Sequence, residues 1–185
     1  MLFRSENEEK GVFSFSNLAE SNVRINQGFI ITNIMATVPA REQYANGTEL
    51  YALIEAAIMP RIFAPDKLNA GDRSIFTKYT GIPLQEGTSM GLSTLGDAYI
   101  NFGLFGGALF MFILGLLYSE VLILFHKNST LYPVLILFTA LVFYYPIRPD
   151  CETQTILGHL VKSCMLVFGV IYFWRSSFIS RSIKQ

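Results

Sequence analysis

Charged residues are scarce in this chain, and their scarcity excludes several classes of protein. Only 15% of the 185 residues are charged, compared with about 25% in typical soluble domains, and 14 basic residues balance 14 acidic ones. Without a net positive charge, the chain has no electrostatic footprint for nucleic acid. The two cysteines, Cys151 and Cys164, are too few for a disulfide framework and too far apart for a CxxC metal site. Because 51% of the residues are apolar, the composition also argues against a disordered chain and against an ordinary soluble enzyme.

The common catalytic and nucleotide-binding motifs are absent as well. The sequence contains no HExxH, GxSxG, P-loop or GxGxxG, so proteases of those types, nucleotide binding and hydride transfer gain no support. Cys151 is a poor candidate nucleophile, because the acids on either side of it disfavour the thiolate. We expect no metal and no cofactor.

Long uncharged stretches occur in the back half of the chain. The 22 residues 98–119 and the 20 residues 128–147 contain no charged side chain. Residues 156–174 contain only His159 and Lys162 as ionisable groups. A helix needs about 20 mostly apolar residues to cross the hydrocarbon core of a bilayer, and in lipid the backbone must satisfy its own hydrogen bonds.

These stretches predict an all-α, polytopic membrane protein. We expect three transmembrane helices, near 99–124, 131–147 and 156–174. The transmembrane region then covers 98–185 and follows a more polar region, 1–97.

The short loops set the predicted orientation. The link after the first span and the tail after the third lie on one side of the membrane, and together they carry four Lys or Arg and no acid. By the positive-inside rule that side is cytoplasmic, so the carboxy terminus is cytoplasmic. Residues 1–97 and the loop that contains Arg148 then face outward, to the periplasm or the extracellular space.

The outward-facing region, 1–97, has predicted internal structure. Apolar residues recur at helical spacing in two stretches, which predicts amphipathic helices over 22–38 and 48–63 that lie on the membrane surface or cover the spans. Residues 64–97 are rich in Gly, Pro, Ser and Thr and predict an ordered loop. Residues 1–11 contain no signal peptide, so we expect the chain to be the carboxy-terminal part of a larger membrane protein or a truncated reading frame.

Basic residues of the outward-facing side are candidates for binding an anion. Guanidinium groups hold phosphates through paired, charge-assisted hydrogen bonds, so several of them near the outer leaflet can hold a lipid-linked diphosphate. The alternative is a solvated surface with salt bridges. The candidates are Arg24, Arg41, Arg61, Lys67 and Arg148.

Two carboxylates are candidates for acid–base catalysis. Asp97 lies at the mouth of the first predicted span, where it can act as a base, orient an acceptor hydroxyl or cap the helix. Glu152 begins a stripe on the third predicted span, in which Thr155, His159 and Lys162 follow at spacings of three or four. Such a stripe either faces a cavity or a partner, or forms a buried structural network.

The first predicted span also contains a pattern for close packing. Gly103 and Gly107 are separated by the GxxxG spacing, which lets two helices approach closely. We therefore expect this part of the span to pack against another helix.

Two segments carry a family resemblance. Residues 47–67 contain PR followed by P-x-K, and residues 88–107 contain TS followed by GDAYINFGLFGG. These features resemble the carboxy-terminal region of bacterial polysaccharide polymerases, of the O-antigen polymerase (Wzy-like) or oligosaccharide repeat-unit polymerase type. RINQG, residues 24–28, resembles the start of the outer loop in such proteins.

The resemblance implies a metal-independent glycosyltransferase in the bacterial inner membrane. Such an enzyme joins oligosaccharide repeat units that are linked to undecaprenyl diphosphate, at the outer face of the membrane, and membrane lipid surrounds it. A chain-length regulator or other glycan-assembly proteins are the further partners implied. Outer-loop arginines of the family engage the anionic substrate, and this role carries over to Arg24 and Arg61, then to Arg41 and Arg148. The Arg-x15-Gly and Arg-x10-Gly patterns of some members are not met here.

Two other functions stay open at this point. One is a non-enzymatic membrane subunit of a glycan export or assembly complex, in which the glycine face docks a partner helix. The other is a glycan transferase similar to the O-antigen ligases, which moves finished polymer to another acceptor.

Overall fold

The computed structural model of the chain describes residues 26–59, 64–65, 67–84 and 87–182. Within these ranges the chain forms helices and no strand, which confirms the all-α class. The described helices are α2 (Gln27–Thr37), α3 (Thr48–Ile58), α4 (Arg73–Thr80), α5 (Ser93–Ser129), α6 (Leu135–Val142) and α7 (Thr153–Ser182).

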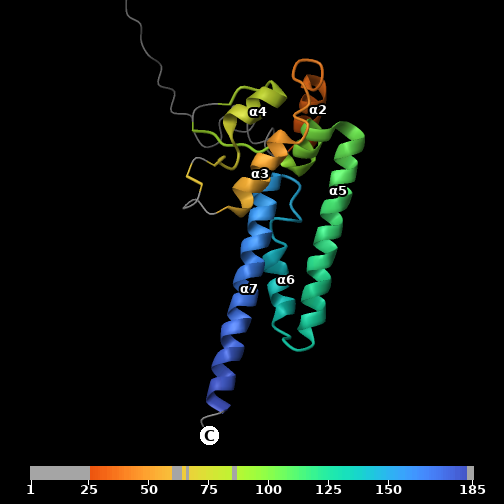
Figure 1. Cartoon of the computed structure of the whole chain (residues 1–185). Coiled ribbons are helices and arrows are strands. Elements are labelled where there is room, and N and C mark those ends of the chain that lie inside the picture. Colours follow the sequence, from red (N-terminus) through yellow and green to blue (C-terminus); the bar gives the residue numbers. More distant parts are fainter. Residues whose placement is uncertain (1–25, 60–63, 66, 85–86, 183–185) are drawn as a thin grey trace, which may run out of the picture.

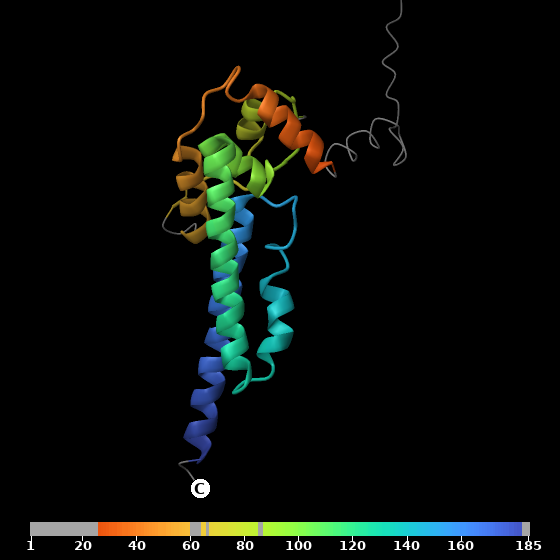
Figure 2. The same ribbon diagram turned by 90° about the vertical axis from the view of Figure 1, so that its right-hand side faces the viewer.

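Three of these helices form an elongated bundle, and the other three form a head at one end of it. α5 and α7 run side by side, and α6 packs against both (Figure 1). The view turned by 90° shows α2, α3 and α4 gathered at the end where α5 and α7 begin (Figure 2). The described helices of the polar half therefore lie at one end of the bundle, in contact with α5 and α7.

α5 and α7 are long and apolar enough to cross a membrane. The candidate spans are Ser93–Ser129 and Thr153–Phe173, with a mean hydropathy of 2.3 and 1.8 in their most apolar windows. The rest of the chain buries only 11% and 28% of these windows. An apolar core helix of a soluble protein would be buried, so the exposed apolar surface is consistent with contact to lipid. The two helices contain most of the first and third predicted spans.

The stretch 131–147, predicted as the second span, forms a shorter helix than expected. α6 has eight residues, and turns lie on both sides of it. Pro146 has no N–H to donate to the carbonyl of Val142, and its ring disfavours the helical conformation at the residue before it. At about 1.5 Å per residue α6 is about 12 Å long, well short of a hydrocarbon core of about 30 Å. The expected membrane-length helix is absent here, and the count of three spans is not confirmed.

α5 consists of two helical segments, 93–102 and 104–129, that meet at Gly103. Gly103 has φ 67° and ψ −165°, a conformation essentially restricted to glycine. The chain bends sharply at this residue, so the first segment packs over the start of the second (Figure 1). A Cβ on Gly107 would lie 3.3 Å from the carbonyl carbon and oxygen of Ala98. The GxxxG glycines therefore let the two segments of α5 pack together, whereas the sequence predicted packing against another helix.

The head has its own apolar core, which includes a helix that the sequence did not predict. Residues 64–97 were expected to be a loop, but α4 forms within them. Asp72 caps α4, because its Oδ1 accepts hydrogen bonds from the N–H groups of Ser74 at 2.8 Å and Ile75 at 3.4 Å. The buried residues of the core are Ile30, Ile34, Val38, Phe76, Tyr79, Leu92 and Ile100.

Helices form in both predicted stretches, as α2 and α3, with shorter bounds. Residues 22–25 and 60–63 of the predictions lie outside the described residues. α2 packs against α4 and α5, whereas α3 packs mainly along α7. Of the two placements expected for these helices, the structure favours the one in which they cover the long helices.

Candidate functional site

Asp97 lies on the first segment of α5 and faces the interior of the head. It is 2% exposed, and its Oδ2 accepts a hydrogen bond of 2.8 Å from the N–H of Thr153, the first residue of α7. A buried carboxylate is costly unless hydrogen bonds compensate it, and helix N-termini offer N–H groups without intrahelical partners. Asp97 therefore satisfies a donor at the start of α7, whereas the capping role considered for it was at the start of its own helix.

Further hydrogen bonds fix the junction around Asp97. The N–H and the hydroxyl of Thr94 both donate to the carbonyl of Cys151, at 2.8 and 2.9 Å. The side chain of Asn101 accepts from the N–H of Leu50 at 3.1 Å and donates to the carbonyl of Asp97 at 2.8 Å. The first segment of α5 is thus tied both to the loop before α7 and to α3.

Glu152 connects the start of α7 to the loop that precedes α4. Its Oε1 accepts a hydrogen bond of 2.8 Å from the N–H of Gly71, and the residue is 8% exposed. Burial raises the pKa of Glu152, and the hydrogen bond from Gly71 opposes this shift. A Cβ on Gly91 would lie 3.0 Å from Oε2, so the chain passes close to the carboxylate. Glu152 therefore stabilises the loop as a buried acceptor.

Asp97 and Glu152 line the same small cavity. Glu49 and Asp72 also contribute to its wall, and its volume is about 10 Å³. That space holds about one water molecule and no sugar. In this conformation the two carboxylates bind backbone groups, and their catalytic roles stay predictions. Within the described ranges, no group of three His, Cys, Asp or Glu residues could hold a metal ion.

Arg148 lies in the loop between α6 and α7 and pairs with Asp150. Its Nη2 and Nε donate to the two carboxylate oxygens at 2.6 and 3.1 Å, and the two side chains are 41% and 40% exposed. The hydrogen-bonded pair raises the pKa of Arg148 and lowers that of Asp150. The guanidinium also lies near the rings of Tyr144 and Tyr145, 5.9 and 5.6 Å from their centroids. It is thus held at the surface in a defined position.

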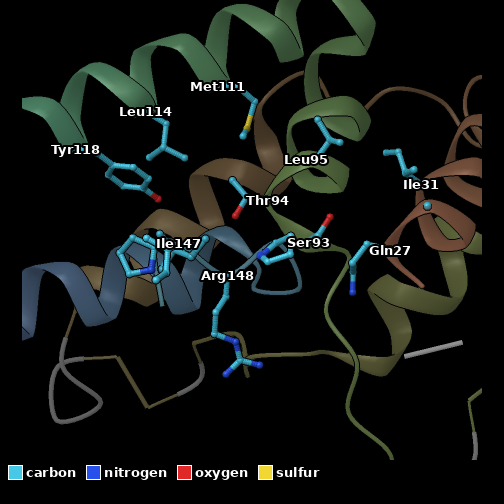
Figure 3. Close-up of a pocket in the computed structure, with 14 residues that line it drawn as sticks. Gln27, Ile31, Ser93, Thr94, Leu95, Met111, Leu114, Tyr118, Ile147 and Arg148 are labelled. Carbon is cyan, nitrogen blue, oxygen red and sulfur yellow. The ribbon is translucent and has the colours of Figure 1, made fainter. Parts of the chain in front are cut away.

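A largely apolar groove of about 420 Å³ lies beside Arg148, between the kinked start of α5, α2 and the loop 146–149. Figure 3 shows Met111, Leu114 and Tyr118 projecting from α5 toward the loop, while the guanidinium of Arg148 extends away from them. The hydroxyl of Tyr118 is buried and has no hydrogen-bond partner among the described residues. The groove therefore combines an apolar wall with a cationic group at its edge.

The stripe predicted on α7 divides in the structure. Glu152 is directed to Gly71, whereas Thr155, His159 and Lys162 line a separate hollow together with Lys67. Of the two arrangements left open by the sequence, three of the four residues therefore have the one that faces a cavity. It also places Lys67 against α7, which the sequence alone did not predict.

The three predicted anion-binding residues that the structure describes do not converge on one cavity. Arg148 borders the groove, Lys67 lines the hollow on α7, and Arg41 is exposed in the turn after α2, where it lines neither. Arg24 and Arg61 lie outside the described residues. A single arginine clamp therefore gains no support from the residues that are described.

Sequence reasoning missed the residues that build the groove. Met111, Leu114 and Tyr118 recur at spacings of three and four, so they share one face of α5. The signal for the groove that the sequence did contain was a tyrosine, Tyr118, on a continuous apolar face of a helix. The bend at Gly103 and the loop at 146–149, which complete the groove, had no such signal.

Cys151 is a free, buried thiol whose surroundings raise its pKa. Burial raises its pKa first, and the neighbouring carboxylate of Asp150 raises it further. The thiolate is thus disfavoured, in the direction expected from the flanking acids.

Comparison with known proteins assigns no family to this architecture. No protein family model, no curated protein and no solved structure matches the chain.

Proposed function

We propose that this chain is part of a membrane-embedded polymerase of surface polysaccharide. In this function, oligosaccharide repeat units linked to a lipid diphosphate are joined at the outer face of the bacterial cytoplasmic membrane. The observation that carries the proposal is the groove of about 420 Å³, with apolar walls on a membrane-length helix and Arg148 at its edge. The family resemblance of residues 47–67 and 88–107 supplies the reaction class.

The groove suits an amphiphile with an anionic head. Its wall, formed by Met111, Leu114 and Ile147 among others, offers apolar surface to a lipid chain. Asp150 occupies Nε and Nη2 of Arg148, so the other N–H groups of the guanidinium can still donate to a phosphate. Because exposed ion pairs contribute only about 0–1 kcal/mol, a diphosphate can compete with Asp150 for the guanidinium.

The proposed reaction needs charge stabilisation more than covalent chemistry. The acceptor hydroxyl oxygen forms a bond to the anomeric carbon of the donor sugar, and the bond from that carbon to the diphosphate oxygen breaks. The lipid diphosphate leaves with the electron pair, and a fixed cation such as Arg148 stabilises its charge. Asp97 or Glu152 accepts the proton of the hydroxyl, which requires the loop over the small cavity to open.

The membrane arrangement belongs to the same proposal. Residues 131–147 form a third crossing, with turns at both ends of α6, and the chain is multi-pass. Residues 1–97 and the Arg148 loop face outward, and the carboxy terminus is cytoplasmic. Arg24, Arg41, Arg61 and Lys67 are further candidates for contact with the diphosphate or the glycan.

Substitution of Arg148 in the intact protein tests the function. Arg148→Ala should reduce long-chain glycan about 100-fold, because a fixed donor to the leaving group is lost. Arg148→Lys should keep part of the activity, since it keeps the charge but loses the paired hydrogen bonds. Lys127→Ala, at the opposite end of α5, is the matched control and should leave the polymer ladder unchanged on electrophoresis.

The outcome also separates the alternatives. A normal ladder from Arg148→Ala would reject Arg148 as a substrate-binding residue and the groove as the reaction site. Full-length polymer that accumulates on its lipid carrier in a deletion strain would indicate a ligase. A normal ladder from every arginine substitution would indicate a non-enzymatic subunit.

A further inference from the structure

A second cavity lies on the other wall of the head, between α3, α7 and the loop that carries Lys67. Its volume is about 380 Å³, and none of its lining residues is acidic. Three of them, Lys67, His159 and Lys162, carry basic groups. In a chain whose basic and acidic residues are equal in number, such a hollow is a local concentration of positive charge.

The hollow is a built feature of the packing between α3 and α7. A Cβ on Gly158 would lie 3.4 Å from the carbonyl oxygen of Ala57, so this glycine lets the two helices approach closely. The side chain of Gln154 donates to the carbonyl of Leu68 at 3.0 Å and thereby ties the Lys67 loop to α7. The wall that carries Lys67 is therefore held in place from two sides.

The basic groups are positioned by specific contacts. Nζ of Lys67 donates to the carbonyls of Ala56 and Met59, at 2.7 and 2.6 Å, near the end of α3. Nε2 of His159 lies 2.8 Å from the carbonyl of Leu141, and because a carbonyl only accepts, this nitrogen is the donor. The ring of Tyr145 packs edge-on against His159, with 4.8 Å between the centroids. These contacts fix two of the three basic groups.

Lys162 is the basic group without such a contact. It is exposed and forms no ion pair with another residue in the described part of the chain. It lies nine positions after the first residue of α7, about 14 Å along a helix of membrane length. A cation at this depth is costly unless a partner or a water-filled hollow receives it, and its flexible stem lets the ammonium reach toward the interface.

We propose that this hollow binds the phosphate group of an anionic amphiphile at the membrane interface. The phosphate lies between Lys67 and Lys162, next to the imidazole of His159, and the apolar part lies along α7 in the bilayer. The site does not depend on the polymerase function, because it would hold an anionic membrane lipid in a protein with any activity.

Binding of phosphatidylglycerol to the full chain in detergent, measured by native mass spectrometry, tests the site. Phosphatidylcholine, which carries no net charge, is the lipid control. We expect phosphatidylglycerol to bind more tightly, and Lys162→Gln to weaken it about fivefold, as expected for one basic residue near an anionic headgroup. Lys162→Arg should restore the binding, and Lys127→Gln, which removes a lysine at the far end of α5, should not change it.

Competition identifies the source of the phosphate. Displacement of phosphatidylglycerol by millimolar inorganic phosphate would mean that the phosphate group alone is recognised, and failure to displace it would mean that the intact lipid is the ligand. Equal binding of wild type and Lys162→Gln would overturn the site. Loss of phosphatidylcholine binding to the same extent would overturn it as well, because the effect would then not depend on the charge of the lipid.

Discussion

Replacement of Gly103 by alanine should destabilise the fold, whereas the same change at Gly115, also in α5, should not. Gly103 is where the helix breaks and its first segment turns over the second. That segment carries Asp97 and Asn101, whose hydrogen bonds connect α5 to α7 and to α3. A residue that cannot adopt the Gly103 conformation therefore strains the junction of the whole molecule.

The magnitude follows from the backbone rather than from crowding. A Cβ on Gly103 would lie 3.4 Å from ring atoms of Tyr44, a tight contact that a small ring movement can relieve. The backbone at φ 67° and ψ −165° cannot be relieved in this way. Residues held in such sparsely populated regions cost about 1–3 kcal/mol each, so we expect Gly103→Ala to lower the free energy of unfolding by about that amount.

Gly115→Ala on the same helix is the matched control. Gly115 lies in regular helix, and a Cβ there would have no neighbour within 4 Å. Alanine is favoured over glycine in a helix interior by about 0.5–1 kcal/mol, so this variant should be slightly more stable than the wild type. Unfolding in mixed detergent micelles, followed by circular dichroism, measures both variants. If Gly103→Ala is as stable as Gly115→Ala, the break at Gly103 is not a feature of the folded protein.

Two further predictions concern the buried carboxylates. Asp97→Ala should lower the free energy of unfolding by about 1–3 kcal/mol, because the N–H of Thr153 loses its acceptor. Asp97→Asn should lower it less, because the amide oxygen can still accept this hydrogen bond. Equal losses of stability for the two variants on chemical denaturation would contradict the role of the hydrogen bond. The pKa of Glu152 in the folded state is raised above its ordinary value of 4.5 by burial, so its contribution to stability is full below that pH and is lost as the pH rises through the raised pKa. Glu152→Gln should flatten this part of the stability–pH curve, and an unchanged curve would show that Glu152 is not the group that titrates.

The long helices could be predicted from composition, whereas their interruptions could not. The uncharged stretches of the back half indicate α5 and α7, because a segment that crosses lipid must be apolar over many successive residues and must form a helix to satisfy its backbone hydrogen bonds. α6 departs from this pattern because turns flank it on both sides, and at its end Pro146 has no N–H to donate to the carbonyl of Val142, whatever the hydropathy around it. α4 forms for the opposite reason, since the cap of Asp72 and the burial of Phe76 and Tyr79 outweigh a composition typical of loops.

The same limit applies to the candidate site: the sequence indicates which residues are candidates, but it does not show where they lie in the fold. The sequence marks Asp97, Glu152 and the stripe on α7 as polar groups in an apolar setting, and all of them line cavities of the structure. Which cavity each one lines depends on long-range packing. The bend at Gly103 directs Asp97 to Thr153, and the close approach of α3 to α7 at Gly158 places Lys67 and Lys162 in the wall of one hollow. Neither placement has a local signal in the sequence.

The buried carboxylates have a structural role, and a test of catalysis must distinguish that role from a catalytic one. Asp97 and Glu152 hold the N–H groups of Thr153 and Gly71, and these bonds join the head to the first turn of α7. An amide side chain of the same shape can still accept such a bond, but it cannot take a proton from a hydroxyl. Asp97→Asn and Glu152→Gln therefore keep the junction and remove the base. A variant that folds normally and makes no polymer would assign catalysis to its carboxylate, whereas normal polymer from both variants would leave these residues a purely structural role.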